Sequence, residues 1–342
     1  MKYWIILLCL FTSFGVFAQG NQTREANVLI LTTGGTIASR KDAPMVNGSA
    51  LVVAIPKLKD IANITQEEFS TIGSSKITPA HWLSLAKTIN THFEENKSLT
   101  GIVITHGTDT LEETAFFLNL TVKWDKPVVL TGSMKSSDEV SADGPANLIN
   151  AVKVASNAGA IGQGVLVVLN ENITSARDVR KTDNRRVDTF EGGNVGHIGT
   201  VDPAGVRFYH KSLHPHTTNS EFDITNISSL PYVPILGDYS GFDESLVEDF
   251  TSDEMVGLVI RTFAGGRMSH GMIAGLANLE RFDLKVVVTS RVPKGRIVQA
   301  PNYPFKAVFS RGLQDNKTRI LLMLSLTKTN DMSEIKRMFE TY

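Results

Sequence analysis

Two turns rich in hydroxyl groups hold the residues whose types could do chemistry. A short apolar run from Asn27 to Thr32 leads into Thr33–Thr36 (TGGT), and another from Gly101 to Thr105 leads into His106–Thr110 (HGTDT). A threonine hydroxyl is a weak nucleophile unless a neighbouring base takes its proton. The two turns therefore predict a nucleophilic site, and the nature of that site depends on the groups that accompany them.

The second turn is the more specific of the two. It places the Thr108 hydroxyl and the Asp109 carboxylate before a predicted helix, where the positive end of the helix dipole stabilises an anion. The carboxylate could hold a lysine beside the hydroxyl, and a desolvated lysine can serve as a base. The first turn alone could equally cradle a phosphate. However, no P-loop ending and no Gly-x-Gly-x-x-Gly pattern follows a strand, so a nucleotide site is disfavoured.

An α/β alternation must position these turns. Predicted strands cover residues 27–32, 69–72, 101–105, 127–131 and 164–169, and helical patterns follow Pro79, Thr110 and Asp143. The segment from Thr110 to Glu113 fits a capping box. This pattern predicts a doubly wound, mainly parallel sheet, in which functional sites lie beyond the carboxyl ends of the strands.

A second, smaller α/β domain is predicted after a linker. Residues 25–210 form the predicted N-terminal domain, 211–230 the linker and 231–342 the C-terminal domain. Strands are expected near 233–237, 256–260, 284–289 and 319–325, and a last helix from Asp331. His210, His214 and His216 fall in or beside the linker, where surface histidines are expected. No cluster has metal-ligand spacing, so neither metal nor cofactor is predicted.

The first 18 residues predict a cleavable secretory signal peptide. They hold one charge at Lys2, an apolar run from Trp4 to Phe17, and a cleavage site after Ala18. The alternative, a membrane anchor, would need about 20 apolar residues. Removing the segment removes Cys9, the one cysteine, and moves the formal net charge from −1 to −2. The sequence thus predicts a periplasmic or secreted protein with no nucleic-acid partner, no disulfide and no membrane attachment after cleavage.

Seven segments resemble the bacterial type II L-asparaginases, the exported branch of the asparaginase and glutaminase-asparaginase family. They are 31–38 (LTTGGTIA), 56–63 (PKLKDIAN), 104–114 (ITHGTDTLEET), 126–129 (KPVV), 141–145 (SADGP), 177–182 (RDVRKT) and 290–295 (SRVPKG). The resemblance implies the two-domain asparaginase-like fold. It also implies hydrolysis of the side-chain amide of L-asparagine, or of L-glutamine or a related amide, and assembly as a homodimer or homotetramer.

The resemblance also implies roles for individual residues. Thr36 would be the nucleophile that forms an acyl-enzyme and releases ammonia. Thr108, Asp109 and Lys181 would form a triad in which Lys181 draws a proton through Thr108, while Asp109 holds the lysine and contacts the substrate's amino group. The alternative for Lys181 is a solvated basic loop, because four arginines surround it.

Further residues would bind the substrate. Ser74 matches the hydroxyl that binds the α-carboxylate, Ser133 lies on the next strand-end turn, and Ser75 stands where the family has a glutamine. Arg267 and Asn302 fall at or near positions where the family has an asparagine and a glutamate that act at the neighbouring subunit's site.

The chain departs from the family at the lid and at the substrate's amino end. Residues 37–55 are short for the family's mobile loop and contain no tyrosine, and Ser75, Arg267 and Asn302 replace family residues. Two explanations fit. Either the amide-cleaving core is kept and substrate recognition has been rebuilt, or the fold survives as a weak or inactive homologue that binds a small ligand.

Overall fold

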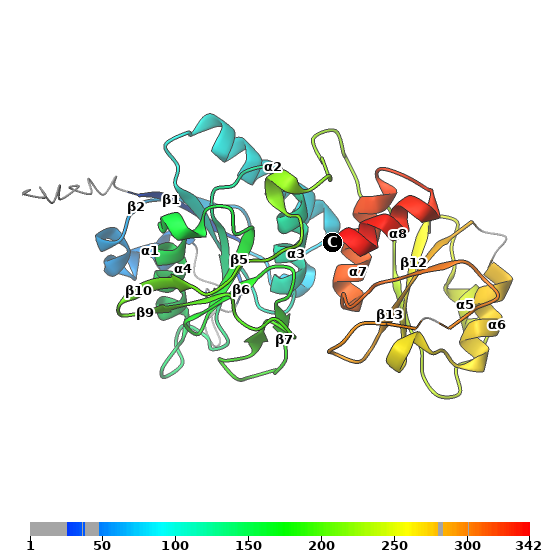
Figure 1. Cartoon of the computed structure of the whole chain (residues 1–342). Helices are drawn as coiled ribbons and strands as arrows, with labels where there is room; N and C mark the ends of the chain where they lie inside the picture. Colours follow the sequence, from blue (N-terminus) through cyan, green and yellow to red (C-terminus); the bar gives the residue numbers. More distant parts are fainter. Residues whose placement is uncertain (1–25, 36, 38–47, 280–282, 300) are drawn as a thin grey trace, which may run out of the picture.

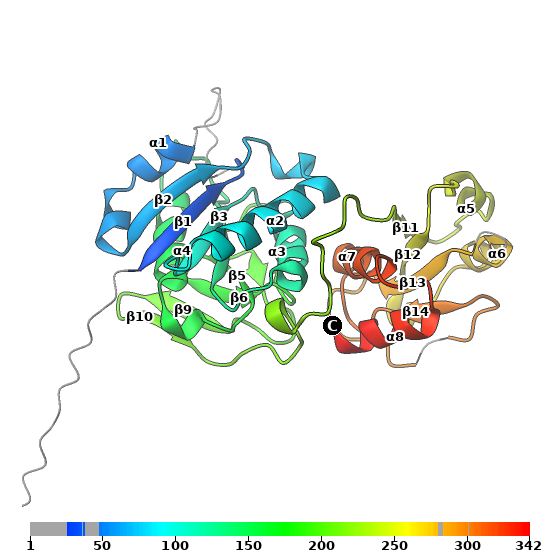
Figure 2. The same ribbon diagram turned by 90° about the horizontal axis from the view of Figure 1, so that it is seen from above.

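The structure, a computed structural model, describes residues 26–35, 37, 48–279, 283–299 and 301–342. Two α/β domains lie side by side, the larger formed by the N-terminal part of the chain (Figures 1 and 2). In these described ranges, no helix is long and apolar enough to cross a membrane. The predicted signal peptide lies outside the described residues.

The large domain is built on an eight-stranded sheet with the order β10-β9-β6-β5-β4-β3-β1-β2. The strands from β2 to β5 are parallel, and β6, β9 and β10 continue the sheet in antiparallel fashion. The prediction of a mainly parallel sheet is therefore confirmed. The bounds are β1 Asn27–Thr32, β2 Asn63–Glu68, β3 Gly101–Thr105, β4 Val128–Thr131, β5 Val165–Leu169, β6 Asn172–Ser175, β9 Gly199–Asp202 and β10 Gly205–Phe208.

Helices cover both faces of this sheet because successive strand residues point to opposite sides. In β1, Leu29 and Leu31 pack in one buried cluster with α2 (Pro79–Glu95) and α3 (Leu111–Thr121). Val28 and Ile30 pack in another cluster with α4 (Gly144–Ala155). Helix α1 (Gly48–Val53) lies near β2, the edge strand. The doubly wound arrangement puts the carboxyl ends of β1, β3 and β4 together at one edge.

The small domain contains a parallel four-stranded sheet between two layers of helices. Its order is β11-β12-β13-β14. Helices α5 (Ser245–Phe250) and α6 (His270–Asn278) pack on one face, and α7 (Asp315–Leu326) and α8 (Met332–Thr341) lie on the side toward the large domain (Figure 1). The strands are Ile235–Gly237, Gly257–Thr262, Lys285–Ser290 and Ala307–Phe309.

One apolar cluster joins the two domains. It includes α2 and α3 side chains of the large domain, α7 side chains such as Leu321, and Val259 and Val287 of the small sheet. Helix α7 therefore packs both on its own sheet and on α3. This places the first turn of α7 next to the start of α3.

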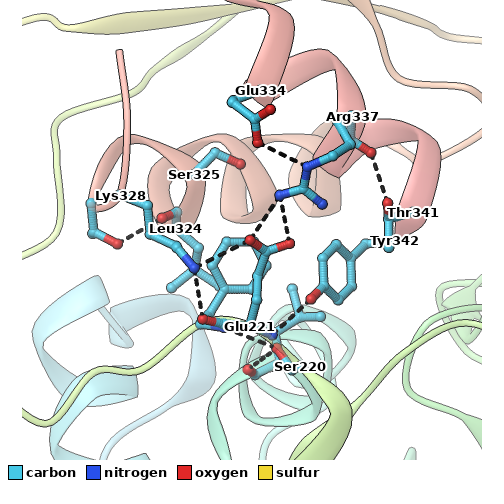
Figure 3. Close-up of polar contacts among 12 residues, drawn as sticks. Ser220, Glu221, Leu324, Ser325, Lys328, Glu334, Arg337, Thr341 and Tyr342 are labelled. Atoms are coloured by element: carbon cyan, nitrogen blue, oxygen red, sulfur yellow. Dashed lines mark hydrogen bonds and ion pairs between the residues drawn. The ribbon is translucent and has the colours of Figure 1, made fainter. Parts of the chain in front are cut away.

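The segment that connects the domains is held down by packing and charge. Phe222 and Ile224 are buried in the same cluster, and Glu221 accepts hydrogen bonds from Lys328 and from Arg337 of α8 (Figure 3). The prediction of surface histidines here is wrong for His216, which is buried and bonds to the Thr217 hydroxyl at 2.9 Å. His210 is exposed, as expected.

We predict that Glu221→Gln weakens this attachment. The side chain of Glu221 is 26% exposed and meets two cations, so losing its charge should lower the free energy of unfolding by about 1 kcal/mol. The loss should shrink in 1 M salt because screening weakens the pair in the native protein. Glu334→Gln is the matched control, since Glu334 binds the same arginine within α8. Equal losses in both variants would contradict a specific role of Glu221.

Three local predictions are wrong. The second strand is β2, residues 63–68 rather than 69–72, because this edge strand carries mostly polar side chains and gives no apolar signal. Residues 319–325 belong to α7, since an unbroken apolar run fits a buried helix as well as a strand. The capping box at Thr110 does not form: α3 has no side-chain cap, and the Thr110 hydroxyl donates to the Ser74 carbonyl at 2.8 Å.

Candidate active site

Glycines let the turns after β1 and β3 touch. A Cβ on Gly35 would lie 2.4 Å from the backbone of Gly107, and one on Gly107 would lie 2.7 Å from the Ser74 hydroxyl. Gly34 and Gly35 also have φ angles of 98° and 87°, which favour glycine. The glycines of the two signature turns thus allow three chain segments to meet at one edge of the sheet.

A buried hydrogen-bond chain fixes the second turn. Trp82 Nε1 donates to the Thr114 hydroxyl at 3.0 Å, and this hydroxyl lies 2.9 Å from His106 Nε2. His106 Nδ1 donates to the Gly107 carbonyl at 2.7 Å, so Nε2 of the neutral ring accepts from Thr114. Burial lowers the pKa of His106 to about 4, although the bond to Gly107 opposes the shift. His106 therefore anchors the turn as a neutral side chain.

Ser74 joins the start of α3 through two bonds. Its hydroxyl accepts from the Asp109 N–H at 3.1 Å, and its carbonyl accepts from Thr110. Ser74 is buried, whereas its neighbour Ser75 is exposed to solvent. The structure therefore brings Ser74 to Asp109 and places Ser75 at the surface beside it.

Lys181 reaches the same turn from a separate hairpin, β7 (Arg180–Lys181) with β8 (Phe190–Glu191). Its Nζ donates to the Thr108 hydroxyl at 3.0 Å and to Asp109 Oδ1 at 3.1 Å. The Lys181 side chain is 19% exposed and that of Asp109 is 65% exposed. Lys181 is thus not a freely solvated member of a basic loop, and the arrangement can pass a proton between an amine and a hydroxyl.

Ser133 lies on the adjacent turn after β4. It is buried and its hydroxyl donates to the Lys135 carbonyl at 2.8 Å. Asp143 accepts from the backbone N–H groups of Met134 and Lys135, and Asn147 bonds to Asp143 and to the Gly132 carbonyl. A Cβ on Gly132 would lie 3.3 Å from the Thr108 side chain, so the turn after β4 borders the turn after β3.

Two of the remaining predicted site residues, Arg267 and Asn302, lie in the small domain, and Thr36 is not described. Thr36 and residues 38–47 of the lid segment lie outside the described residues. Arg267 and Asn302 are exposed residues, and in the described parts of the chain no hydrogen bond or ion pair joins them to Thr108, Asp109 or Lys181. Tyr303, next to Asn302, donates to the Gly266 carbonyl at 2.5 Å.

Sequence reasoning missed the groups that hold the site residues in place. His106 and Glu112 lie inside the 104–114 motif and Asp143 lies inside the 141–145 motif. The partners of His106 and Asp143 are within nine residues of them, whereas Glu112 bonds to Lys181 and Asn316, which are distant in sequence. The presence of His106, Glu112 and Asp143 in these motifs was a signal that they matter, but it did not show what they contact.

Comparisons with known proteins define the family. Residues 27–214 match the family model "Asparaginase, N-terminal", and residues 232–339 match "Glutaminase/Asparaginase C-terminal domain". The chain therefore belongs to the asparaginase family of amidohydrolases.

Individual relatives match over most of their length. L-asparaginase 2 of Bacillus subtilis is 41% identical over 92% of this chain and 86% of the relative. A probable periplasmic L-asparaginase of Haemophilus influenzae is 38% identical over 100% of both chains. The structure of a probable cytoplasmic L-asparaginase from Campylobacter jejuni is 40% identical, covers 93% of this chain and 100% of its own, and has a TM-score of 0.88.

Proposed function

We propose that this protein hydrolyses the side-chain amide of L-asparagine, or of L-glutamine or a related amide, to the acid and ammonia. The observation that carries the proposal is the contact of Lys181 Nζ with Thr108 and Asp109 in a chain of the asparaginase family. In our proposal, the Thr36 hydroxyl attacks the amide carbon, and the C–N bond breaks as the nitrogen takes a proton and leaves as ammonia. Water then hydrolyses the ester and restores the hydroxyl.

The proposed relay moves the protons in both steps. Lys181 and Thr108 exchange a proton across their 3.0 Å hydrogen bond, and Asp109 holds the lysine from its exposed side. Ser74 would bind the substrate's α-carboxylate, with Ser133 lining the same pocket. Because Ser75 is short and exposed, we propose that the substrate's amino end is recognised differently here than in relatives with a glutamine at that position.

We also propose that the protein is exported and that it assembles with itself. Cleavage after Ala18 would give a chain of residues 19–342, with domains at 25–210 and 231–342 joined by the linker 211–230. Like the Haemophilus relative, whose name describes it as periplasmic, it would act outside the cytoplasm. In a homodimer or homotetramer, Arg267 and Asn302 would reach the neighbouring subunit's site. No cofactor is required by the proposed chemistry.

The test is ammonia release by residues 19–342 with L-asparagine, L-glutamine, D-asparagine and β-aspartyl compounds. We expect turnover of at least one amide, and Thr36→Ala should reduce it by about a thousandfold or more, because the proposed acyl-enzyme cannot form. If the wild-type protein releases no more ammonia than Thr36→Ala on any of these amides, the enzyme proposal fails. A small-ligand-binding role would then remain.

A further inference from the structure

Lys181 is attached to the start of α3 at two points. Its Nζ bonds to Thr108 at 3.0 Å, and its backbone N–H donates to Glu112 Oε2 at 2.8 Å. Thr108 and Glu112 are four residues apart at the same strand-to-helix junction. Both the backbone and the amine of Lys181 are thus bonded to the start of α3, which limits where the amine of this long, flexible side chain can lie.

The second oxygen of Glu112 connects this junction to the small domain. Oε1 accepts from Asn316 Nδ2, in the first turn of α7, at 2.7 Å. The Asn316 Oδ1 in turn accepts from the Lys317 N–H at 2.7 Å, which fixes the amide with its nitrogen toward Glu112. Glu112 therefore bridges the Lys181 backbone and α7.

The same turn of α7 holds the residues that precede Lys181. Lys317 is 2% exposed, and its Nζ donates to the carbonyls of Ala176, Arg177 and Val179. Just outside the helix, Gln314 accepts from Arg180. Three carbonyls satisfy all three N–H groups of the buried ammonium, so this segment is fixed to the small domain.

We infer that Glu112 is a positioning residue of the proton relay, through which α7 sets the reach of Lys181. This inference rests on the proposed function, because it assigns a role toward the lysine of that mechanism. In the described part of the chain, the Glu112 carboxylate bonds to the Lys181 N–H and to Asn316, and not to Thr108 or Asp109. It acts by fixing the lysine's backbone, and small displacements of a catalytic group are costly in rate.

The test compares Glu112→Ala and Glu112→Gln in the full-length enzyme. Alanine removes both bonds, so kcat should fall by about tenfold or more while KM stays within about twofold. Glutamine keeps an oxygen for the Lys181 N–H but turns its NH2 group toward Asn316 Nδ2, so it should recover only part of kcat. Asn316→Asp, which places a second carboxylate against Glu112, should lower kcat several-fold although residue 316 belongs to the other domain.

Glu113→Gln is the matched control, since Glu113 is in the same helical turn and makes no described hydrogen bond to Lys181. Its kcat should stay within about twofold of the wild-type value. Two outcomes would overturn the inference if the wild-type enzyme is active. One is an unchanged kcat in folded Glu112→Ala, and the other is an equal change of kcat and KM in Glu112→Ala and Glu112→Gln. A wild-type enzyme without amide hydrolysis would instead show that the proposed function itself is wrong.

Discussion

Lys181→Met is expected to lower kcat for the best amide substrate by about a hundredfold or more. Methionine has nearly the length of lysine but cannot exchange a proton with Thr108 across the 3.0 Å contact. Positioned acid–base groups typically contribute about 10² to 10⁴ in rate. The loss should appear in kcat, measured by steady-state ammonia release.

Thr108→Val provides the companion test because it removes the hydroxyl and keeps the side-chain shape. If the two residues act as one relay, the double variant should be little slower than the slower single variant. Arg186→Met is the control for loss of a cation near the site, since Arg186 is exposed and pairs with Asp188. Full activity in Thr108→Val, or additive losses in the double variant, would show that the relay is assigned wrongly.

The core strands were predictable because their apolar runs are short and flanked by turns. Residues 27–32 and 101–105 coincide with β1 and β3 as predicted. The edges were not predictable in this way. Strand β2 is polar and exposed, and β14 is only three residues long, so neither gives a periodic apolar signal.

The candidate site likewise has one part that the sequence predicts and another that it does not. The turn motifs gave the residue types at the ends of β1 and β3, because local sequence determines a strand-to-helix turn. The supporting contacts depend on pairs far apart in the chain, such as Glu112 with Asn316 and Lys317 with Ala176. No single-sequence pattern records which partners meet across a domain boundary. Tertiary packing, rather than the motif, determines how Lys181 is held.

His106→Gln is expected to change how stability depends on pH. The folded-state pKa of His106 is about 4, against 6.5 for a free histidine, so the unfolded chain binds more protons between these values. The stability that neutral His106 contributes is full above pH 6.5 and is lost as the pH falls toward 4. The difference between the pKa of His106 in the folded and unfolded states corresponds to about 3 kcal/mol of stability. Urea unfolding from pH 4 to pH 8 should therefore show that the wild-type advantage over His106→Gln shrinks on acidification.

Glu113→Gln is a matched variant, because Glu113 changes stability with pH in the opposite direction to His106. Burial, with the nearby Glu112 and Asp315, raises its pKa to about 7, although Arg319 opposes the shift. The folded protein thus binds more protons than the unfolded chain between pH 4.5 and 7, and this stability is lost as the pH rises through 7.

In the wild-type protein, His106 and Glu113 change stability in opposite directions over most of this pH range. Removing His106 should leave stability falling more steeply toward high pH, and Glu113→Gln should leave it falling more steeply toward low pH. Stability curves of both variants that run parallel to the wild-type curve would show that neither group titrates as its burial requires.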